Sequence, residues 1–290
     1  MNLNKLKNYK RYIPKYVKQF VRCVLGQENN PFDVRGLTDN PIEAIYLAKN
    51  RPFVVDAEIN KCRSFFYTGY TYNAKLENPA VSFLLEANKK SIIKKSALEK
   101  YSLTWQPRSA GEVLGLMGKG ASRIHSLPSN QFVYPWESID PVVREERLKR
   151  EEFYYKDQEG KVQKILKGQK LYGPLNPDHM QVEIHRLISV YNSVSLRGFE
   201  RNDGIDGDIS CHLLVYGDDY VFSVNVGTHR AAAVSALGFR TVPVRVTQII
   251  RREDSVNWPH VKDGLFTLSE AEYVFDRFLN GSCTDLQEVR

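Results

Sequence analysis

The sequence lacks a run of about 18 or more apolar residues, and it also lacks a paired-cysteine motif. A transmembrane helix needs about 20 consecutive apolar residues, so we expect no segment to span a membrane. The N-terminus has no continuous apolar run of the signal-peptide kind, which predicts no secretory signal. The four cysteines are widely spaced and form no CxxC pair, which argues against a structural zinc site and a disulfide framework and favours a reducing compartment.

Acidic residues are missing from the first 25 positions, and the first one in the chain is Glu28. This segment carries seven basic residues: Lys5, Lys7, Lys10, Arg11, Lys15, Lys18 and Arg22. Because the net charge of the chain is +7, residues 26–290 are neutral in sum, with 34 basic residues (41 less 7) against 34 acidic ones. A DNA-binding body would carry its own basic excess, so the charge disfavours nucleic acid as a partner, although a local patch stays open.

The basic segment also has helical apolar spacing between Pro14, a suitable helix start, and Gly26, a suitable stop. The apolar positions are Val17, Phe20, Val21, Val24 and Leu25. Such a helix binds an anionic membrane surface, or it packs on the body with its lysines in water; both readings stay open. Equal pelleting with anionic liposomes by a chain lacking residues 1–26 would refute the membrane reading. The basic, Ile-Pro-containing start is similar to that of proteins from bacterial surface-polysaccharide gene clusters.

The composition, 42% hydrophobic and 11% aromatic, allows a buried core in one large or two modest domains. We expect a mixed α/β fold divided into the basic segment 1–26, an N-terminal α/β region of unknown type over 27–160, and a C-terminal domain with a helical extension over 170–290. Proline and glycine punctuation predicts helices at 41–48, 79–86 and 141–152, strands at 52–59 and 62–67, and ordered loop at 98–140. A loop over 257–264 precedes an amphipathic helix over 265–279, with Trp258 and Phe275 covering the core.

An alternating strand from Tyr220 runs into Gly227, and an alanine-rich helix follows with Thr228, His229 and Arg230 as its first residues. The first N–H groups of a helix have no partner inside the helix, and its dipole places partial positive charge there. Glycine lets a phosphate approach the backbone, and the Arg230 guanidinium can grip phosphate oxygens. This pattern predicts a nucleotide-phosphate pocket.

Five ordered elements resemble the ParB/sulfiredoxin superfamily over about residues 172–248. They are Leu175-Asn-Pro177, Ser193-Val-Ser-Leu-Arg-Gly198, Gly227-Thr-His-Arg230, Leu237-Gly238 and Val242-Pro-Val244. The resemblance implies that the C-terminal domain is a ParB/sulfiredoxin-like α/β nucleotide-binding domain.

The helix expected between Pro177 and Gly198 places Arg186, Ser189 and Ser193 on one face, because they stand at i, i+3 and i+7. Sulfiredoxins contact ATP through a basic and two hydroxyl residues at this spacing. The resemblance therefore implies that these side chains line the phosphate side of a pocket opposite Gly227 to Arg230. The alternative is an ordinary amphipathic helix with a solvated polar face.

The sequence departs from the superfamily pattern at three points. Thr228 stands where sulfiredoxin needs a cysteine, which disfavours sulfinic-acid reduction. Val226, with Asn225 before it, stands where related small-molecule kinases carry an Asp, which weakens the case for a kinase-type metal site. Only 44 residues follow Val246, too few for the helix-turn-helix region of partition proteins and a dimerisation tail.

Glu183 is the nearest match by position to the glutamate that acts as base in kinases of the superfamily, and His229 is the second candidate catalytic residue. His229 alternatively packs against or orients the turn. Asp206 and Asp208, in an acidic cluster with Asp203, are candidate Mg²⁺ ligands; a plain turn before the next strand is the alternative. The glycine-rich stretch 115–120 lacks the ending of a P-loop and is either a turn or a binding loop.

These observations predict a protein that binds ATP or CTP, with Mg²⁺ as a candidate cofactor. The first hypothesis is an ATP-dependent phosphotransferase that acts on a small hydroxyl compound or a glycan, in the cytoplasm or at the inner face of the membrane, with surface polysaccharide metabolism as a setting. Alternatives are a nucleotide-sensing interaction protein without turnover and a ParB-like DNA-associated protein.

Overall fold

The computed structural model describes residues 31–65, 69–73, 78–88, 97–118, 120–158, 173–175, 177–201 and 208–281. The basic segment 1–26 and the candidate metal ligand Asp206 lie outside these ranges. In the described part of the chain, no helix combines the length and the apolar character that a membrane crossing requires.

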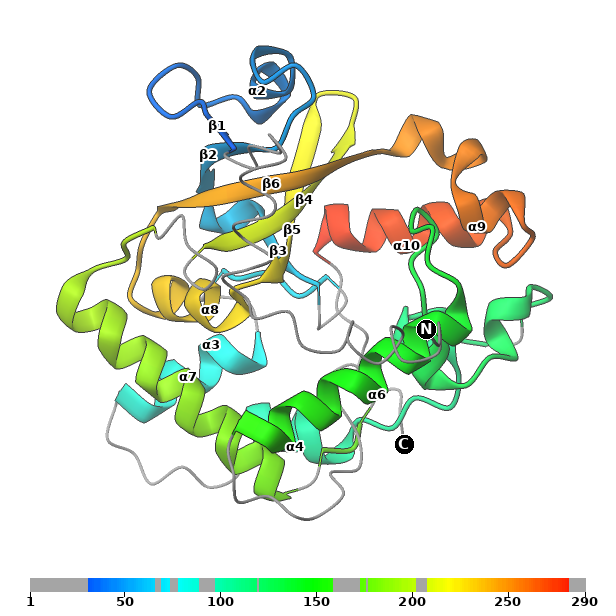
Figure 1. Cartoon of the computed structure of the whole chain (residues 1–290), viewed down its shortest axis with the longest axis horizontal. Helices are drawn as coiled ribbons and strands as arrows, with labels where there is room; N and C mark the ends of the chain where they lie inside the picture. The colour runs from blue at the N-terminus through cyan, green and yellow to red at the C-terminus, as the bar shows by residue number, and fades with distance from the viewer. Residues whose placement is uncertain are drawn as a thin grey trace, which may run out of the picture.

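One six-stranded mixed sheet forms the centre of the molecule, which confirms the α/β class (Figure 1). Its strands are β1 (Phe32–Asp33), β2 (Phe53–Glu58), β3 (Cys62–Ser64), β4 (Ile209–Tyr216), β5 (Asp219–Val226) and β6 (Thr241–Arg251), in the order β1-β2-β6-β4-β5-β3. The β4–β5 hairpin is antiparallel, β6 runs parallel to β4 and antiparallel to β2, and β3 runs parallel to β5. The sheet therefore takes strands from both sides of the boundary expected near residues 160–170.

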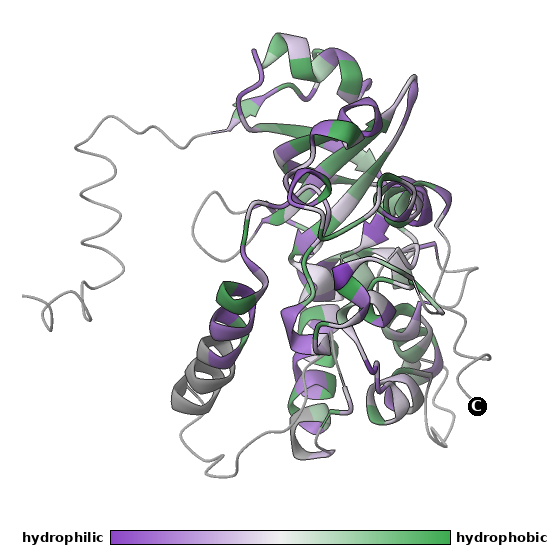
Figure 2. Cartoon of the chain, turned by 90° about the vertical axis from the view of Figure 1, so that its right-hand side faces the viewer, coloured by the Kyte–Doolittle hydropathy of each residue, from purple (hydrophilic) through white to green (hydrophobic). Residues whose placement is uncertain are grey.

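Helices cover the first face of the sheet because its side chains are apolar. The covering helices include α2 (Pro41–Leu47), α3 (Pro79–Asn88), α7 (Pro177–Arg197) and α8 (Thr228–Ala236). Leu187 and Val194 of α7 and the buried residues 231–234 of α8 share one hydrophobic core with Leu213 of β4 and Phe222 of β5. The helices around the sheet alternate hydrophobic and hydrophilic residues along their length, as expected for amphipathic helices on a buried sheet (Figure 2).

An aromatic core covers the second face. Trp136 lies 5.3 Å from Trp258 and 6.0 Å from Phe275 of helix α10 (Leu268–Asn280), measured between ring centroids. Trp258 and Phe275 are buried, as the sequence predicts. The segment from η5 (Arg252–Asn257) through α9 (Pro259–Lys262) leads from β6 to α10.

The expected ordered loop over 98–140 was wrong in part, because α4 (Ala97–Thr104) and α5 (Ala110–Val113) lie there. Leu98, Tyr101 and Trp105 follow helical spacing and are buried, and the rings of Tyr101 and Trp105 stack at 5.9 Å. That burial stabilises α4 despite the surrounding glycines and prolines. The remainder of the stretch contains the short turns η3 (Arg123–His125) and η4 (Ser129–Gln131). Helix α6 (Pro141–Gln158) follows, as predicted but longer.

The first and last glycines of the stretch 115–120 pack closely against other side chains. A Cβ at Gly115 would lie 2.3 Å from Arg277 Cζ, and one at Gly120 would lie 2.1 Å from His125 Nε2. These contacts favour the turn over the binding-loop interpretation.

Because His212 on β4 is largely buried, we expect the free energy of unfolding to depend on pH. Its Nε2 lies 2.9 Å from Asn225 Nδ2, and burial lowers the pKa of the imidazole, with the Glu137 charge opposing this shift in part. Below about pH 6.5 the folded protein therefore binds fewer protons than the unfolded chain. The contribution of neutral His212 to the free energy of unfolding is complete above that pH and is lost as the pH falls.

We expect the unfolding free energy of the wild type to fall more steeply between pH 7 and pH 5 than that of His212→Asn, by up to about 1.4 kcal/mol per pH unit. Urea denaturation at several pH values measures this difference. The matched variant His185→Asn, at an exposed position on α7, should keep the wild-type pH dependence. Equal slopes for the wild type and His212→Asn would contradict the prediction.

Candidate functional site

The predicted strand–glycine–helix unit is present at the carboxyl end of β5. Gly227 caps the N-terminus of α8 in the left-handed region, with φ of 78°, and the helix begins at Thr228. Gly227 also lies against β4, because a Cβ there would come within 2.9 Å of the Asp208 carbonyl oxygen and 3.1 Å of Ile209 Cα. A glycine is therefore required by the fold itself at the position where the sequence suggested phosphate approach.

Replacement of Gly227 by alanine is expected to destabilise the protein by more than the same change at Gly238. Both residues have positive φ, which costs alanine about 1–3 kcal/mol, but nothing lies within 4 Å of a Cβ at Gly238. Gly227→Ala adds the backbone contact with Asp208. Differential scanning calorimetry should show a lower melting temperature for Gly227→Ala than for Gly238→Ala, and equal melting temperatures would show that the contact relaxes without cost.

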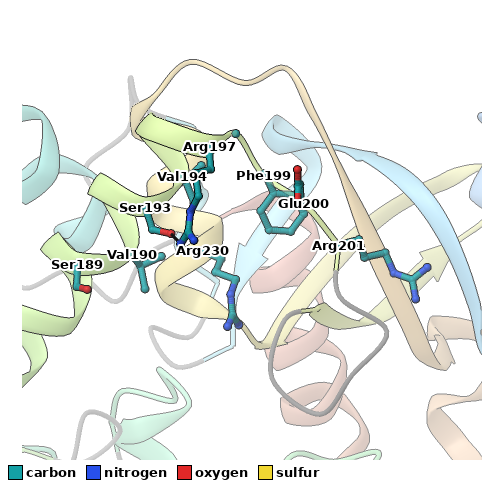
Figure 3. A pocket seen from close by; sticks show the side chains of 10 residues that line it. Ser189, Val190, Ser193, Val194, Arg197, Phe199, Glu200, Arg201 and Arg230 are labelled. Atoms are coloured by element: carbon teal, nitrogen blue, oxygen red, sulfur yellow. Dashed lines mark hydrogen bonds between the residues drawn. The ribbon is translucent and has the colours of Figure 1, made fainter.

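A cavity of about 600 Å³ lies between α7, the residues that follow it, and α8 (Figure 3). It contains three residues of the predicted phosphate site, Ser189 and Ser193 from α7 and Arg230 from α8. The other described lining residues are Val190, Val194, Arg197, Gly198, Phe199, Glu200 and Arg201. The structure thus brings together side chains that are about 40 positions apart in the sequence.

Four predicted residues, Arg186, Gly227, Thr228 and His229, are not among the described lining residues of this cavity. The sequence reasoning missed Arg197, Phe199 and Arg201. Arg197 continues the Ser189–Ser193 spacing by one more helical step of four, so the face of α7 could have revealed it. Phe199 and Arg201 follow the helix and have no periodic signal.

Arg197 and Arg201 of the cavity lining contact other side chains of the protein. Arg197 donates a hydrogen bond to Ser193 Oγ. Arg201 donates to Asp208 through Nε at 2.9 Å and Nη2 at 3.2 Å, and both side chains are about one-tenth exposed. This fork-to-carboxylate geometry is the strong form of an ion pair and holds Arg201 at the edge of the cavity.

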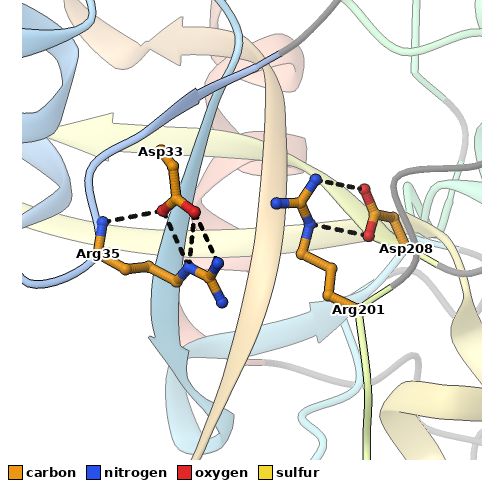
Figure 4. Close-up of polar contacts among 4 residues, drawn as sticks. All are labelled: Asp33, Arg35, Arg201 and Asp208. Atoms are coloured by element: carbon orange, nitrogen blue, oxygen red, sulfur yellow. Dashed lines mark hydrogen bonds and ion pairs between the residues drawn. The ribbon is translucent and has the colours of Figure 1, made fainter.

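A second arginine–carboxylate pair links Asp33, the last residue of β1, with Arg35 two positions later (Figure 4). The hydrogen bond from Arg35 lowers the pKa of Asp33, and the charge of Arg201 adds to this shift. The two ion pairs are therefore close enough for their charges to interact. Each carboxylate has a guanidinium partner, Asp33 with Arg35 and Asp208 with Arg201.

Asp208 does not fit the predicted role of magnesium ligand, since both of its oxygens accept hydrogen bonds from Arg201. Within the described ranges, no group of three or more His, Cys, Asp or Glu residues could hold a metal ion.

Glu183 and His229, the candidate catalytic residues, form a hydrogen-bonded pair between α7 and α8. Glu183 Oε2 lies 3.0 Å from His229 Nε2, and Glu183 Oε1 lies 3.7 Å from Arg186 Nη1. Glu183 is buried, and the pair lines a second, much smaller cavity of about 20 Å³ beside Ser102 and Met180. The contact orients the first turn of α8. The catalytic role of this pair stays a prediction.

No protein-family model matches the chain, and searches of curated proteins and of solved structures found no match.

Proposed function

We propose that this protein binds a nucleotide by its phosphates in the cavity between α7 and α8 and transfers a phosphoryl group to a small hydroxyl compound or a glycan. The observation that carries the proposal is the meeting of Ser189, Ser193 and Arg230 at one cavity of about 600 Å³. These three belong to the seven residues for which the sequence resemblance to ParB/sulfiredoxin proteins implies a phosphate-binding role. A cavity of this size falls within the range of about 300–1,000 Å³ that is usual for small-molecule sites.

The charges of the cavity suit a phosphate chain. Its described lining includes three arginines and one acid, Glu200. Arg230 is the third residue of α8, so its backbone and side chain both lie in the positively polarised first turn of that helix. Serine hydroxyls on α7 can donate hydrogen bonds to the remaining phosphate oxygens.

Phosphoryl transfer relies on positioning and on neutralisation of charge, which are functions that arginines and helix N-termini supply. In the proposed reaction, the acceptor hydroxyl oxygen bonds to the terminal phosphorus, the bond to the nucleoside diphosphate breaks, and a base takes the hydroxyl proton. Glu183 and His229 are our candidates for that base.

A second candidate function is nucleotide sensing without turnover. Two observations favour it: Asp208 is neutralised by Arg201, and Glu183 lies at a separate small cavity and not at the large one. In that case, bound nucleotide shifts a conformational equilibrium. A DNA-associated role is the third candidate, and salt-sensitive retention on DNA would favour it. Placement at the inner face of a membrane, in surface polysaccharide metabolism, depends on residues 1–25, which lie outside the described residues.

Isothermal titration calorimetry with ATP, ADP and CTP, each with and without Mg²⁺, tests the proposal. We expect saturable binding of at least one nucleotide, with affinity that depends on its phosphates. ³¹P nuclear magnetic resonance of the same mixtures, with sugars and polyols added as hydroxyl acceptors, then separates the first two candidates, because sustained formation of nucleoside diphosphate and of a phosphorylated acceptor requires turnover and a sensor leaves ATP intact. Absence of binding by all three nucleotides would refute both candidates.

A further inference from the structure

An aromatic side chain lines the large cavity. Phe199 is the only aromatic residue among its described lining residues, and it is half-buried. Gly198 ends α7, and its N–H bonds to the Val194 carbonyl oxygen at 2.8 Å. A hydrophobic residue directly after such a glycine commonly packs back on the last helical turn, and Phe199 does pack against the core that contains Val194. The backbone and this contact therefore hold the ring at a defined place beside the cavity (Figure 3).

The described lining of the cavity combines charged and hydrogen-bonding groups with one ring. The lining residues of α7 extend from Ser189 to Arg197, which is about 12 Å along a helix that rises 1.5 Å per residue. Arg230 belongs to the first turn of α8, where a phosphate is stabilised. Phe199 follows the C-terminus of α7, and Glu200 beside it supplies a carboxylate, while the neighbouring guanidinium groups of Arg197 and Arg201 contact Ser193 and Asp208. Phosphates therefore fit best beside Arg230, and Phe199 offers apolar surface for an uncharged part of the same ligand.

Building on the proposed function, we propose that Phe199 and Glu200 form a base subsite: the nucleobase stacks on Phe199, and its exocyclic amino group donates a hydrogen bond to the Glu200 carboxylate. An aromatic ring stacks on any base and contributes to affinity without reading its sequence. A carboxylate placed to accept from the exocyclic amino group of cytosine or adenine disfavours uracil, which presents a carbonyl oxygen at the position of the cytosine amino group. The ligand class is therefore a nucleoside phosphate with an amino-bearing base, such as ATP or CTP. UTP and polyphosphate without a base bind more weakly.

Calorimetric titration of the full chain with ATP, UTP and inorganic tripolyphosphate tests the base subsite. We expect ATP to bind about tenfold more tightly than UTP and tripolyphosphate. Phe199→Leu, which keeps an apolar contact with the core, should lower ATP affinity about tenfold and leave tripolyphosphate affinity unchanged. Phe199→Trp should retain the wild-type preference, since it keeps a stacking surface. Glu200→Ala should reduce the ratio of ATP affinity to UTP affinity. Phe239→Leu, at an exposed phenylalanine that is not among the lining residues, is the matched control and should behave as the wild type.

The outcomes separate the base subsite from the phosphate site. Equal affinity for ATP and tripolyphosphate would overturn the base subsite and retain the phosphate site. ATP binding that Phe199→Leu does not change would place the base elsewhere and overturn the inference as well. If Phe199→Leu lowers the affinity for tripolyphosphate as much as that for ATP, Phe199 has a structural role only and the base subsite is overturned. Binding of neither ATP nor tripolyphosphate by the wild type would overturn the proposed function together with the inference.

Discussion

Arg230→Ala is expected to weaken ATP binding by roughly 10- to 150-fold, the effect of losing a charge-assisted hydrogen bond worth about 1.5–3 kcal/mol. Arg230 is the one residue that lines the large cavity from the first turn of α8, so side chain and helix N-terminus act on the same phosphate group. Calorimetry measures the affinity, and an unchanged melting temperature shows that the variant is folded.

Two further variants sharpen this test. Arg230→Lys keeps the charge but loses the planar fork, so its affinity should lie between those of the wild type and Arg230→Ala. Arg240→Ala removes an exposed arginine that is not among the lining residues, and it should leave binding unchanged. An equal loss in Arg230→Ala and Arg240→Ala would indicate attraction by net charge and contradict a specific phosphate contact.

Phe275→Ala is expected to lower the free energy of unfolding by about 3–5 kcal/mol, the usual cost of truncating a fully buried phenylalanine. Phe275 on α10 has no exposed surface, and its ring lies 6.0 Å from Trp136 and 5.8 Å from Trp258. Truncation leaves a void between these rings. Urea denaturation followed by tryptophan fluorescence measures the loss. Tyr273→Ala, at a half-exposed position on the same helix, should cost about 1 kcal/mol or less.

The same denaturation curves test whether the two halves of the chain unfold as one cooperative unit. Trp136 comes from the N-terminal half of the sequence, and Phe275 comes from its C-terminal end, yet both belong to one core. We therefore expect a single cooperative transition for the wild type that Phe275→Ala shifts as a whole. Two separate transitions, only one of them shifted, would show that the halves unfold independently.

Local patterns predicted the parts of the structure that depend on neighbouring residues. The alternation from Tyr220, the glycine at 227 and the alanine-rich run after it predicted the strand to within one residue, the turn, and the start of α8 at Thr228. The missed helix α4 also has a local signal in Leu98, Tyr101 and Trp105, but flanking loop residues obscured it. By contrast, the pairing of β2 with β6 and of β3 with β5 joins segments more than 150 residues apart, and no local pattern encodes such pairing.

The sequence likewise predicted some features of the candidate site and not others. Turn chemistry predicted Arg230, while helical spacing together with the family resemblance predicted Ser189 and Ser193, and the structure brings the three side chains to one cavity. The partner of Asp208 could not be read from spacing, because its contact with Arg201 depends on tertiary geometry; in that contact both carboxylate oxygens accept hydrogen bonds from the guanidinium group. The contact between Glu183 and His229 likewise depends on how α7 and α8 pack, which sequence alone does not specify.

The most direct test of the central claim is a crystal structure of the protein grown with ATP. We predict that the phosphates lie between Ser193 and Arg230, with the adenine ring against Phe199. Density for ATP at another place, with the cavity between α7 and α8 free of nucleotide, would contradict the proposed site.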